Sequence, residues 1–270
     1  FYTDPDSTDR FLVADEVGLG KTLVARGLIA KTIDYLQGKV DRIDIVYICS
    51  NISIASQNIN RLNVSGVQEF VHPTRLSLLP IQIAGIQKNH LNYISLTPGT
   101  SFDPKSREGI IDERALIYYI LKNRLDLKRS GFKRLLQCRV SDENWNRKIR
   151  EWRPDSLDKS IEEKYIEDIQ NDPDLYQRLV DFCIKSSRRV LWDDDERLRL
   201  VEILRLRLAE VSVEILEPDL IILDEFQRFK DLLDKKNPDA ALAHRLFKYP
   251  GVKTLLLSAT PYKVLSLNNE

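Results

Sequence analysis

The most telling residues of this chain are Phe11-Leu12-Val13-Ala14-Asp15-Glu16-Val17-Gly18-Leu19-Gly20-Lys21-Thr22. They begin with a short apolar run, which is typical of a strand, and continue into a glycine-rich turn. From Lys21 to Gln37 apolar residues recur with helical spacing, and Gly38 marks the end of the predicted helix. A strand, a glycine-rich loop and a helix in this order predict a phosphate-binding loop, so we expect the chain to bind a nucleoside triphosphate.

The glycine-rich loop predicts a role for each polar group in it. Its backbone amides and the positive end of the following helix would surround phosphate oxygens. Lys21 would reach the β- and γ-phosphates, and the Thr22 hydroxyl would ligate Mg²⁺. Asp15 stands where the strict pattern has glycine, and the alternative interpretation of the segment is an ordinary turn. The predicted ATP-binding residues are Asp15, Gly18, Leu19, Gly20, Lys21 and Thr22.

A second pattern lies far downstream, where the apolar run Leu220-Ile221-Ile222-Leu223 ends in Asp224-Glu225-Phe226-Gln227. An acidic pair at the tip of a buried strand suits metal-assisted hydrolysis. Asp224 would hold Mg²⁺, usually through water, and Glu225 would orient and deprotonate the attacking water. The alternative is a solvated strand end. With Lys21, these two carboxylates are the predicted catalytic residues.

A third pattern, Ser258-Ala259-Thr260, follows the apolar run Thr254-Leu255-Leu256-Leu257. A glycine-rich loop, an Asp-Glu box and a Ser-Ala-Thr motif in this order resemble the first RecA-like lobe of superfamily 2 helicases and translocases, the DEAD/DEAH-like ATPases. The loop itself looks most like that of Swi/Snf-type double-strand DNA translocases and of helicase-like proteins from bacterial restriction and phage-defence systems. The resemblance implies an α/β fold, with a parallel sheet flanked by helices, that uses ATP and Mg²⁺.

The resemblance also implies which residues couple the ATP site to movement. They are Gln227, Ser258 and Thr260. Gln227 replaces the His or Asp that usually ends the Asp-Glu box, so the coupling contact differs from the usual one in the family.

Two further loops look like the nucleic-acid-facing motifs of such a lobe. The predicted strand 43–49 ends at Ser50 and Asn51, and the predicted strand 93–96 ends at Thr97. Small hydroxyl and amide groups suit contacts to a phosphate backbone, which position a strand without reading its bases. The alternative is that both are ordinary turns. The residues that the resemblance assigns to nucleic-acid binding are Ser50, Asn51, Thr97, Pro98, Gly99 and Thr100.

The pattern along the chain predicts one lobe interrupted by an insertion. Residues 1–103 and 218–270 alternate apolar strands with helices, whereas 104–217 reads as long, charged, amphipathic helices. The apolar stripe of 195–216 is interpreted as core, with docking of a partner protein as the alternative. An excess of basic residues between Leu121 and Arg153 is either the solvated face of the insertion or a surface for nucleic acid.

Composition limits the remaining possibilities. The 270 residues include 41 basic and 41 acidic side chains, and this balance argues against a protein that coats nucleic acid unspecifically. Three scattered cysteines without metal-ligand spacing indicate a reducing compartment and no zinc site. No apolar stretch reaches membrane-spanning length, so we expect a cytoplasmic protein without a membrane partner.

We therefore expect the ATP-hydrolysing motor lobe of a DNA helicase or double-strand DNA translocase. An RNA helicase lobe is one alternative, and a nucleotide-dependent switch that binds a partner protein is another. The resemblance implies a second RecA-like lobe, which we do not find in this sequence and which supplies arginine residues to the ATP site. We expect the isolated lobe to be nearly inactive for that reason.

Overall fold

The structure is a computed structural model, and it divides the chain into two compact units. It describes residues 2, 8–16, 18, 20–66, 70–71, 75–86, 88–97, 107–151, 157–187, 194–229 and 241–259. Unit 1 consists of Phe1–Thr74, Gly85–Phe102 and Leu216–Glu270, and unit 2 of Arg75–Ala84 and Asp103–Ile215.

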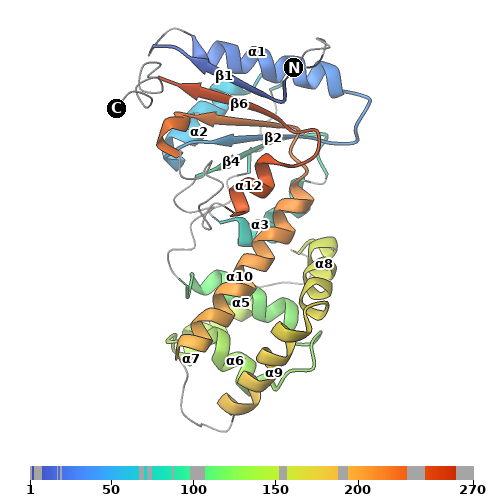
Figure 1. Cartoon of the computed structure of the whole chain (residues 1–270), viewed down its shortest axis with the longest axis vertical. Coiled ribbons are helices and arrows are strands. Elements are labelled where there is room, and N and C mark those ends of the chain that lie inside the picture. Colours follow the sequence, from blue (N-terminus) through green and yellow to red (C-terminus); the bar gives the residue numbers. More distant parts are fainter. Residues whose placement is uncertain are drawn as a thin grey trace, which may run out of the picture. The chain divides into compact units, whose positions relative to one another are not determined.

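Unit 1 is an α/β unit built on a parallel sheet (Figure 1). The strand order is β1-β6-β5-β2-β4-β3, and every neighbouring pair is parallel. Its elements are β1 (Arg10–Ala14), α1 (Lys21–Leu36), β2 (Ile43–Ile48), α2 (Ile52–Leu62), β3 (Phe70–Val71), β4 (Leu91–Leu96), β5 (Leu220–Asp224), the 3-10 helix η3 (Phe226–Phe229), α12 (Ala241–Phe247) and β6 (Lys253–Ser258). The predicted α/β class with a parallel sheet flanked by helices is confirmed for this unit.

The register of the sheet brings the predicted motifs to one edge. Ala14 of β1 pairs with Ser258 of β6, and Asp224 of β5 pairs with Leu257 of β6. Because β2 pairs with β5 in parallel, its end at Ile48 lies beside Leu223. Loops at the carboxyl ends of parallel strands form the usual ligand-binding edge of an α/β sheet.

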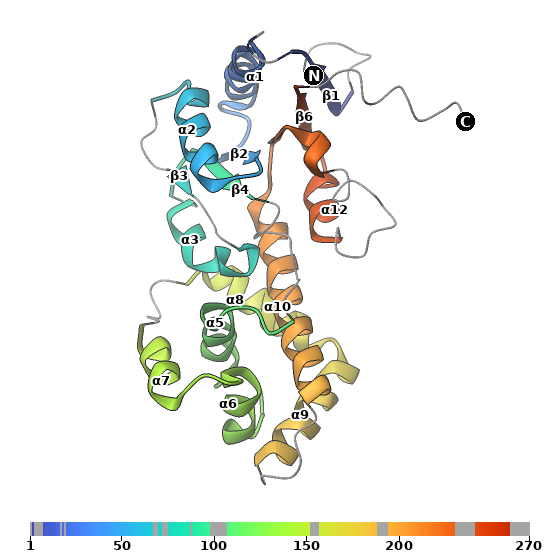
Figure 2. The ribbon, with the colours of Figure 1, turned by 90° about the vertical axis from the view of Figure 1, so that its left-hand side faces the viewer.

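Helices cover both faces of this sheet. α1 and α2 lie on one side and α12 on the other (Figure 2). Ala25 and Ile29 of α1 belong to the same buried core as Tyr47 of β2 and Ile59 of α2. Strands covered on both faces need mostly apolar residues, which explains the apolar runs 45–48 of β2 and 220–223 of β5. The edge strand β1 differs, because Phe11 and Leu12 are 51% and 45% exposed.

Unit 2 is helical in the part that the structure describes. Its elements are η1 (Leu76–Leu78), α3 (Leu79–Ile86, whose last two residues fall in unit 1), α5 (Ile111–Leu121), α6 (Arg129–Gln137), α7 (Asp142–Glu151), α8 (Lys159–Gln170), α9 (Pro173–Ser187) and α10 (Asp194–Leu216, whose last residue falls in unit 1). The stripe of α10 interpreted as core is buried at Val201, Leu204, Leu208 and Val211. The polar residues Arg197 and Ser212 of α10 are buried as well, and their burial was not predicted.

The segment Arg75–Ala84 belongs to unit 2, whereas the sequence pattern placed it in the first part of the lobe. Glu113 of α5 explains the difference. Its carboxylate accepts from the Ser77 hydroxyl at 2.5 Å, lies 3.7 Å from Arg75 Nε and forms an ion pair with Arg205 at 3.1 Å. A buried carboxylate needs such partners, and two of them come from this segment.

Three basic residues of the stretch between Leu121 and Arg153 form ion pairs with acidic residues within unit 2. Arg124 pairs with Glu162, and Lys133 pairs with Asp142. Lys148 contacts both Asp112 and Glu151. These pairs favour the interpretation of a solvated helical face.

None of the helices that the structure describes has the length and apolar character needed to cross a membrane.

Candidate active site

The loop between β1 and α1 has the backbone geometry that glycine permits. Gly18 and Gly20 have φ angles of 91° and 88°. Residues with a side chain rarely adopt this region, at a cost of roughly 1–2 kcal/mol each. Glycine at both positions therefore lets the chain turn from strand to helix without that cost. The predicted ATP-binding residue Leu19 lies outside the described residues.

The amino terminus of α1 is open to an anion. Gly20 is the N-cap, no side chain caps the helix, and its first turn contains no acidic residue. The amides of Leu23 and Val24 already bond to the Gly20 carbonyl, at 2.8 and 3.1 Å. The preceding helical amides have no partner within the helix and carry its positive end, which favours binding of phosphate.

Lys21 stands at this helix terminus as an unneutralised cation. Its ammonium group donates to the carbonyl oxygens of Asp15 and Glu16, both at 2.7 Å. Within the described part of the chain it has no carboxylate partner. Backbone carbonyls thus hold the ammonium beside the loop while leaving its charge to a ligand.

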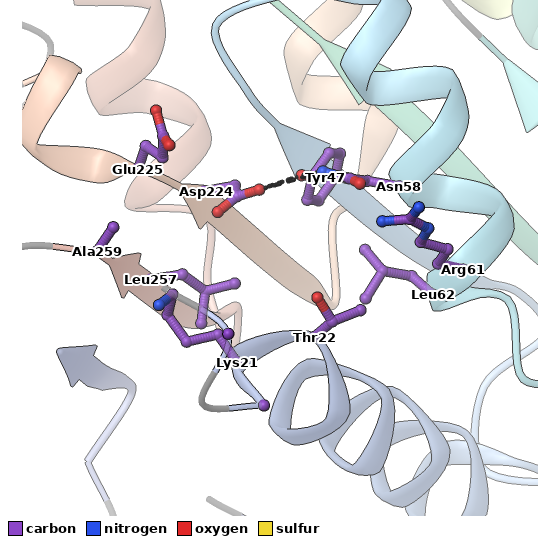
Figure 3. Close-up of a pocket in the computed structure, with 12 residues that line it drawn as sticks. Lys21, Thr22, Tyr47, Asn58, Arg61, Leu62, Asp224, Glu225, Leu257 and Ala259 are labelled. Atoms are coloured by element: carbon purple, nitrogen blue, oxygen red, sulfur yellow. Dashed lines mark hydrogen bonds between the residues drawn. The ribbon is translucent and has the colours of Figure 1, made fainter. Parts of the chain in front are cut away.

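A cleft of about 390 Å³ joins the loop to the Asp-Glu box (Figure 3). Its walls come from β1–α1, β2, α2, β5 and β6, all in unit 1. The lining residues are Gly18, Gly20, Lys21, Thr22, Tyr47, Asn58, Arg61, Leu62, Asp224, Glu225, Leu257 and Ala259. The structure therefore brings together the predicted residues Lys21, Thr22, Asp224 and Glu225, although α10 and unit 2 separate them in the sequence.

Glu225 has an unusual backbone for a residue with a side chain. Its φ is 53°, at the point where β5 passes into η3. Its carboxylate lies 2.6 Å from Arg228 Nε and is 39% exposed. A left-handed residue outside glycine stores strain of about 1–3 kcal/mol and is typical of functional sites. The turn directs the Glu225 side chain away from the line of β5, apart from that of Asp224 (Figure 3).

Asp224 is held by two neutral side chains that the sequence analysis did not assign to the site. Tyr47 of β2 donates its hydroxyl to Asp224 Oδ2 at 2.5 Å, and Asn58 of α2 donates to the Tyr47 hydroxyl at 2.8 Å (Figure 3). Asn58 also lies 3.4 Å from Asp224 Oδ2. Burial of the phenol, together with the Asp224 carboxylate, raises the pKa of Tyr47 far above its usual range. Tyr47 therefore remains a proton donor.

Arg61 is a second cation on the cleft wall that sequence reasoning missed. It belongs to the last turn of α2, and its side chain is exposed to the cleft. Among the residues that the structure describes, it forms no ion pair. The sequence contained no signal for it, because an exposed arginine at a helix end is common.

Of the predicted coupling residues, Ser258 lies between the two halves of the site, at the end of β6. β6 is flanked by β1 and β5, and the Asp15 amide donates to the Ser258 carbonyl at 3.1 Å. Ser258 is buried. The side-chain carbonyl of Gln227 is buried without a hydrogen-bond partner in the described part of the chain. The third predicted coupling residue, Thr260, lies outside the described residues.

Three of the six residues predicted to bind nucleic acid lie in the described part of the chain. Ser50 and Asn51 are exposed directly after β2, and the Asn51 carbonyl accepts from the Ala55 amide at the start of α2. Thr97 is buried, so its side chain does not present itself to a ligand here. Pro98, Gly99 and Thr100 lie outside the described residues.

The oxygen ligands of the cleft fit a hard cation. Thr22 offers a hydroxyl and Asp224 a carboxylate, and Mg²⁺ prefers oxygen and commonly binds through one or two protein ligands plus phosphates and water. The described residues contain no group of three or more His, Cys, Asp or Glu side chains that could hold a metal by themselves. A cation in this cleft would therefore need ligands from a bound nucleotide and from water.

Comparisons with protein families, with curated proteins and with solved structures found no match for this chain.

Proposed function

We propose that unit 1 is a RecA-like lobe that binds and hydrolyses ATP in a nucleic-acid motor of the superfamily 2 type, with double-stranded DNA as the favoured track. The observation that carries the proposal is the single cleft that contains both motifs. An uncapped helix terminus and the ammonium group of Lys21, which has no carboxylate partner among the described residues, line one end, and two carboxylates from β5 and its following turn line the other.

Each residue of the cleft has a distinct part in this proposal. Lys21 contacts the β- and γ-phosphates, and the amides at the start of α1 bind their oxygens. Thr22 and Asp224 hold Mg²⁺, which would draw negative charge from the phosphates when bound. Glu225 orients the attacking water and accepts its proton.

The strand order supports a path from hydrolysis to movement. β6 lies between the strand of the glycine loop and the strand of the Asp-Glu box, so Ser258 adjoins both. Gln227, whose side-chain oxygen is buried and unpartnered among the described residues, can gain a hydrogen bond when this edge rearranges. Ser50 and Asn51 at the end of β2 are the exposed candidates for backbone contacts to nucleic acid.

The decisive experiment is ATP hydrolysis by the full-length protein at fixed low salt, alone and with double-stranded DNA, single-stranded DNA or RNA. We expect the largest stimulation with double-stranded DNA. Strongest stimulation by RNA would instead identify an RNA helicase lobe. Equal rates in all four conditions would contradict a motor and favour a nucleotide-dependent switch that binds a protein.

Lys21→Ala is the matched variant for this experiment. Removal of the ammonium group should abolish hydrolysis in every condition, because the charge that faces the phosphates is lost. Turnover at the wild-type rate in this variant would refute the assignment of the glycine loop.

A further inference from the structure

The hydrogen bonds around Asp224 join three elements that are distant in the sequence. Tyr47 comes from β2, Asn58 from α2 and Asp224 from β5, and all three side chains line the same cleft. The Tyr47 hydroxyl donates a hydrogen bond to Asp224 Oδ2 and accepts one from the side-chain amide of Asn58. The same amide also lies within hydrogen-bond distance of Asp224 Oδ2, so both donors converge on one oxygen of the carboxylate.

This arrangement leaves the two Asp224 oxygens with different surroundings. Oδ2 accepts from Tyr47 at 2.5 Å and lies 3.4 Å from the Asn58 amide. In the described part of the chain Oδ1 has no hydrogen-bond partner. A carboxylate fixed in this way presents one defined oxygen to a cation, and Mg²⁺ tolerates little departure from octahedral geometry.

The surroundings of Tyr47 make the contact rigid. The phenol is 2% exposed and lies in the core between the sheet and the helices α1 and α2. A buried side chain on a central strand cannot follow Asp224 if the carboxylate rotates. Asn58 is half-buried, and its helix begins beside the exposed Ser50 and Asn51, so the position of α2 sets the geometry of the network.

We propose that Tyr47 and Asn58 are positioning residues that orient the Asp224 carboxylate for the metal of the bound nucleotide, and that they make this orientation depend on α2. The inference rests on the proposed function. It gives two neutral side chains outside the predicted motifs a role in metal binding.

Binding of Mn²⁺ in place of Mg²⁺ tests the inference without any turnover. Free Mn²⁺ would be measured by electron paramagnetic resonance for the full-length protein with a non-hydrolysable ATP analogue. We expect Tyr47→Phe and Asn58→Ala each to weaken Mn²⁺ binding by about 10- to 100-fold, as is usual when an outer partner of a metal ligand is lost. The affinity for the analogue without divalent metal should not change.

Two matched variants control for general effects. Tyr93→Phe removes a hydroxyl that accepts from the Val64 amide, on an equally buried tyrosine of β4, a strand that β2 separates from the Asp224 strand β5. Asn60→Ala changes an exposed residue on the same helix as Asn58. Both should bind Mn²⁺ like the wild type.

Because Tyr47 and Asn58 act through one carboxylate, the loss of Mn²⁺ affinity in the double variant should be smaller than the product of the losses in the two single variants.

The outcomes separate this inference from the proposed function. Mn²⁺ affinity in Tyr47→Phe and Asn58→Ala equal to that of the controls would overturn the inference alone. If Tyr47→Phe fails to fold, the half-buried Asn58→Ala decides by itself. Wild-type protein that binds the analogue and Mn²⁺ but is not stimulated by nucleic acid would refute the motor and leave the inference intact. Failure of the wild type to bind any nucleotide would overturn both.

Discussion

The cleft of unit 1 and the interior of unit 2 use charged side chains in opposite ways. In unit 2 the carboxylate of Glu113 is 1% exposed and is matched by the guanidinium of Arg205 at 3.1 Å. Among the described residues of unit 1, the carboxylate of Asp224 has only neutral donors, Tyr47 and Asn58, and the ammonium group of Lys21 has only backbone carbonyls.

The partners of a charged side chain distinguish a charge that stabilises the fold from one that is available to bind a ligand. A buried ion pair is complete in itself, and breaking it costs more than making it gains. A charged group whose hydrogen-bond partners are all neutral is not neutralised and can attract a ligand of opposite charge, as is common at functional sites. The cleft of unit 1 should therefore respond to substitution in binding and rate, and the network of unit 2 in stability.

The strongest test of the comparison is Glu225→Gln. Loss of the base should lower turnover by about 10²- to 10⁴-fold, because the amide cannot accept a proton from water. Nucleotide binding and the free energy of unfolding should change little. Steady-state hydrolysis and analogue binding by the full-length protein measure the two effects.

Arg228→Gln is the control, since it removes the cation that pairs with Glu225 and keeps the base. This exposed pair should contribute little to turnover. Glu225→Gln protein that lost nucleotide binding and turnover together, with its fold intact, would contradict the role of a base.

The next effect belongs to unit 2. Glu113→Gln removes the carboxylate from a buried ion pair with Arg205, so the free energy of unfolding should fall by about 3–5 kcal/mol. Urea unfolding followed by circular dichroism measures it. The exposed Glu163 of α8 provides the control, because Glu163→Gln should stay within about 0.5 kcal/mol of the wild type. A loss no larger than the control's would show that the network is not structural.

Asp44 sharpens the comparison, because it is a buried charge of unit 1 at the sheet edge opposite the cleft. Burial raises the pKa of its carboxyl to about 7, despite Arg42 at 2.9 Å and a hydrogen bond from Asn92. Between about pH 4 and this value the unfolded chain releases the proton and the folded chain keeps it. The free energy of unfolding should therefore fall as pH rises, by up to about 1.4 kcal/mol per unit, and level off above the folded pKa.

Urea unfolding of wild type and Asp44→Asn across this pH range isolates the contribution of Asp44, since the amide does not titrate. The wild type should lose stability relative to the variant as pH rises. Asp219 also has a pKa raised by burial, and its side chain accepts a hydrogen bond from the backbone amide of Asp44. Asp44→Asn keeps this backbone amide, so Asp219 should contribute equally to the pH dependence of the wild type and of the variant. A wild type that gained stability relative to Asp44→Asn as pH rose would contradict the raised pKa of Asp44.

The smallest effect is expected at Arg61. This exposed cation faces the cleft without an ion-pair partner among the described residues, so Arg61→Ala should weaken nucleotide binding by no more than about five-fold at low salt. High salt should remove the difference. Arg26→Ala, on the exposed side of α1 and away from the cleft, should bind nucleotide like the wild type. Equal affinities of the two variants at low salt would exclude a role for Arg61.

The sequence was informative wherever a local pattern determines local geometry. The predicted helix from Lys21 to Gln37 ends one residue earlier, at Leu36, and the predicted strand 220–223 extends by one residue to Asp224. Glycine spacing and apolar runs carry this information directly. The loop and the Asp-Glu box then share one edge of the sheet because the parallel strands β1, β6 and β5 end together.

Contacts between distant segments were beyond the sequence. Tyr47 and Asp224 are 177 positions apart, and their hydrogen bond follows from the pairing of β2 with β5. The left-handed backbone of Glu225 has no sequence signature, because glutamate rarely adopts it. The segment Arg75–Ala84 belongs to unit 2, where Ser77 and Arg75 contact the Glu113 carboxylate, and these partners could not be chosen in advance.

The pairing of β1 with β6 has a consequence for how the protein is made. Lys253 and Asp9 at this junction form an ion pair at 2.6 Å although they are 244 positions apart. The strand that leads into the glycine loop therefore emerges from the ribosome early but cannot join the sheet until β6 has been synthesised. Closing so long a segment is slow. The edge of the sheet that carries the glycine-rich loop is therefore completed only after β6 has left the ribosome.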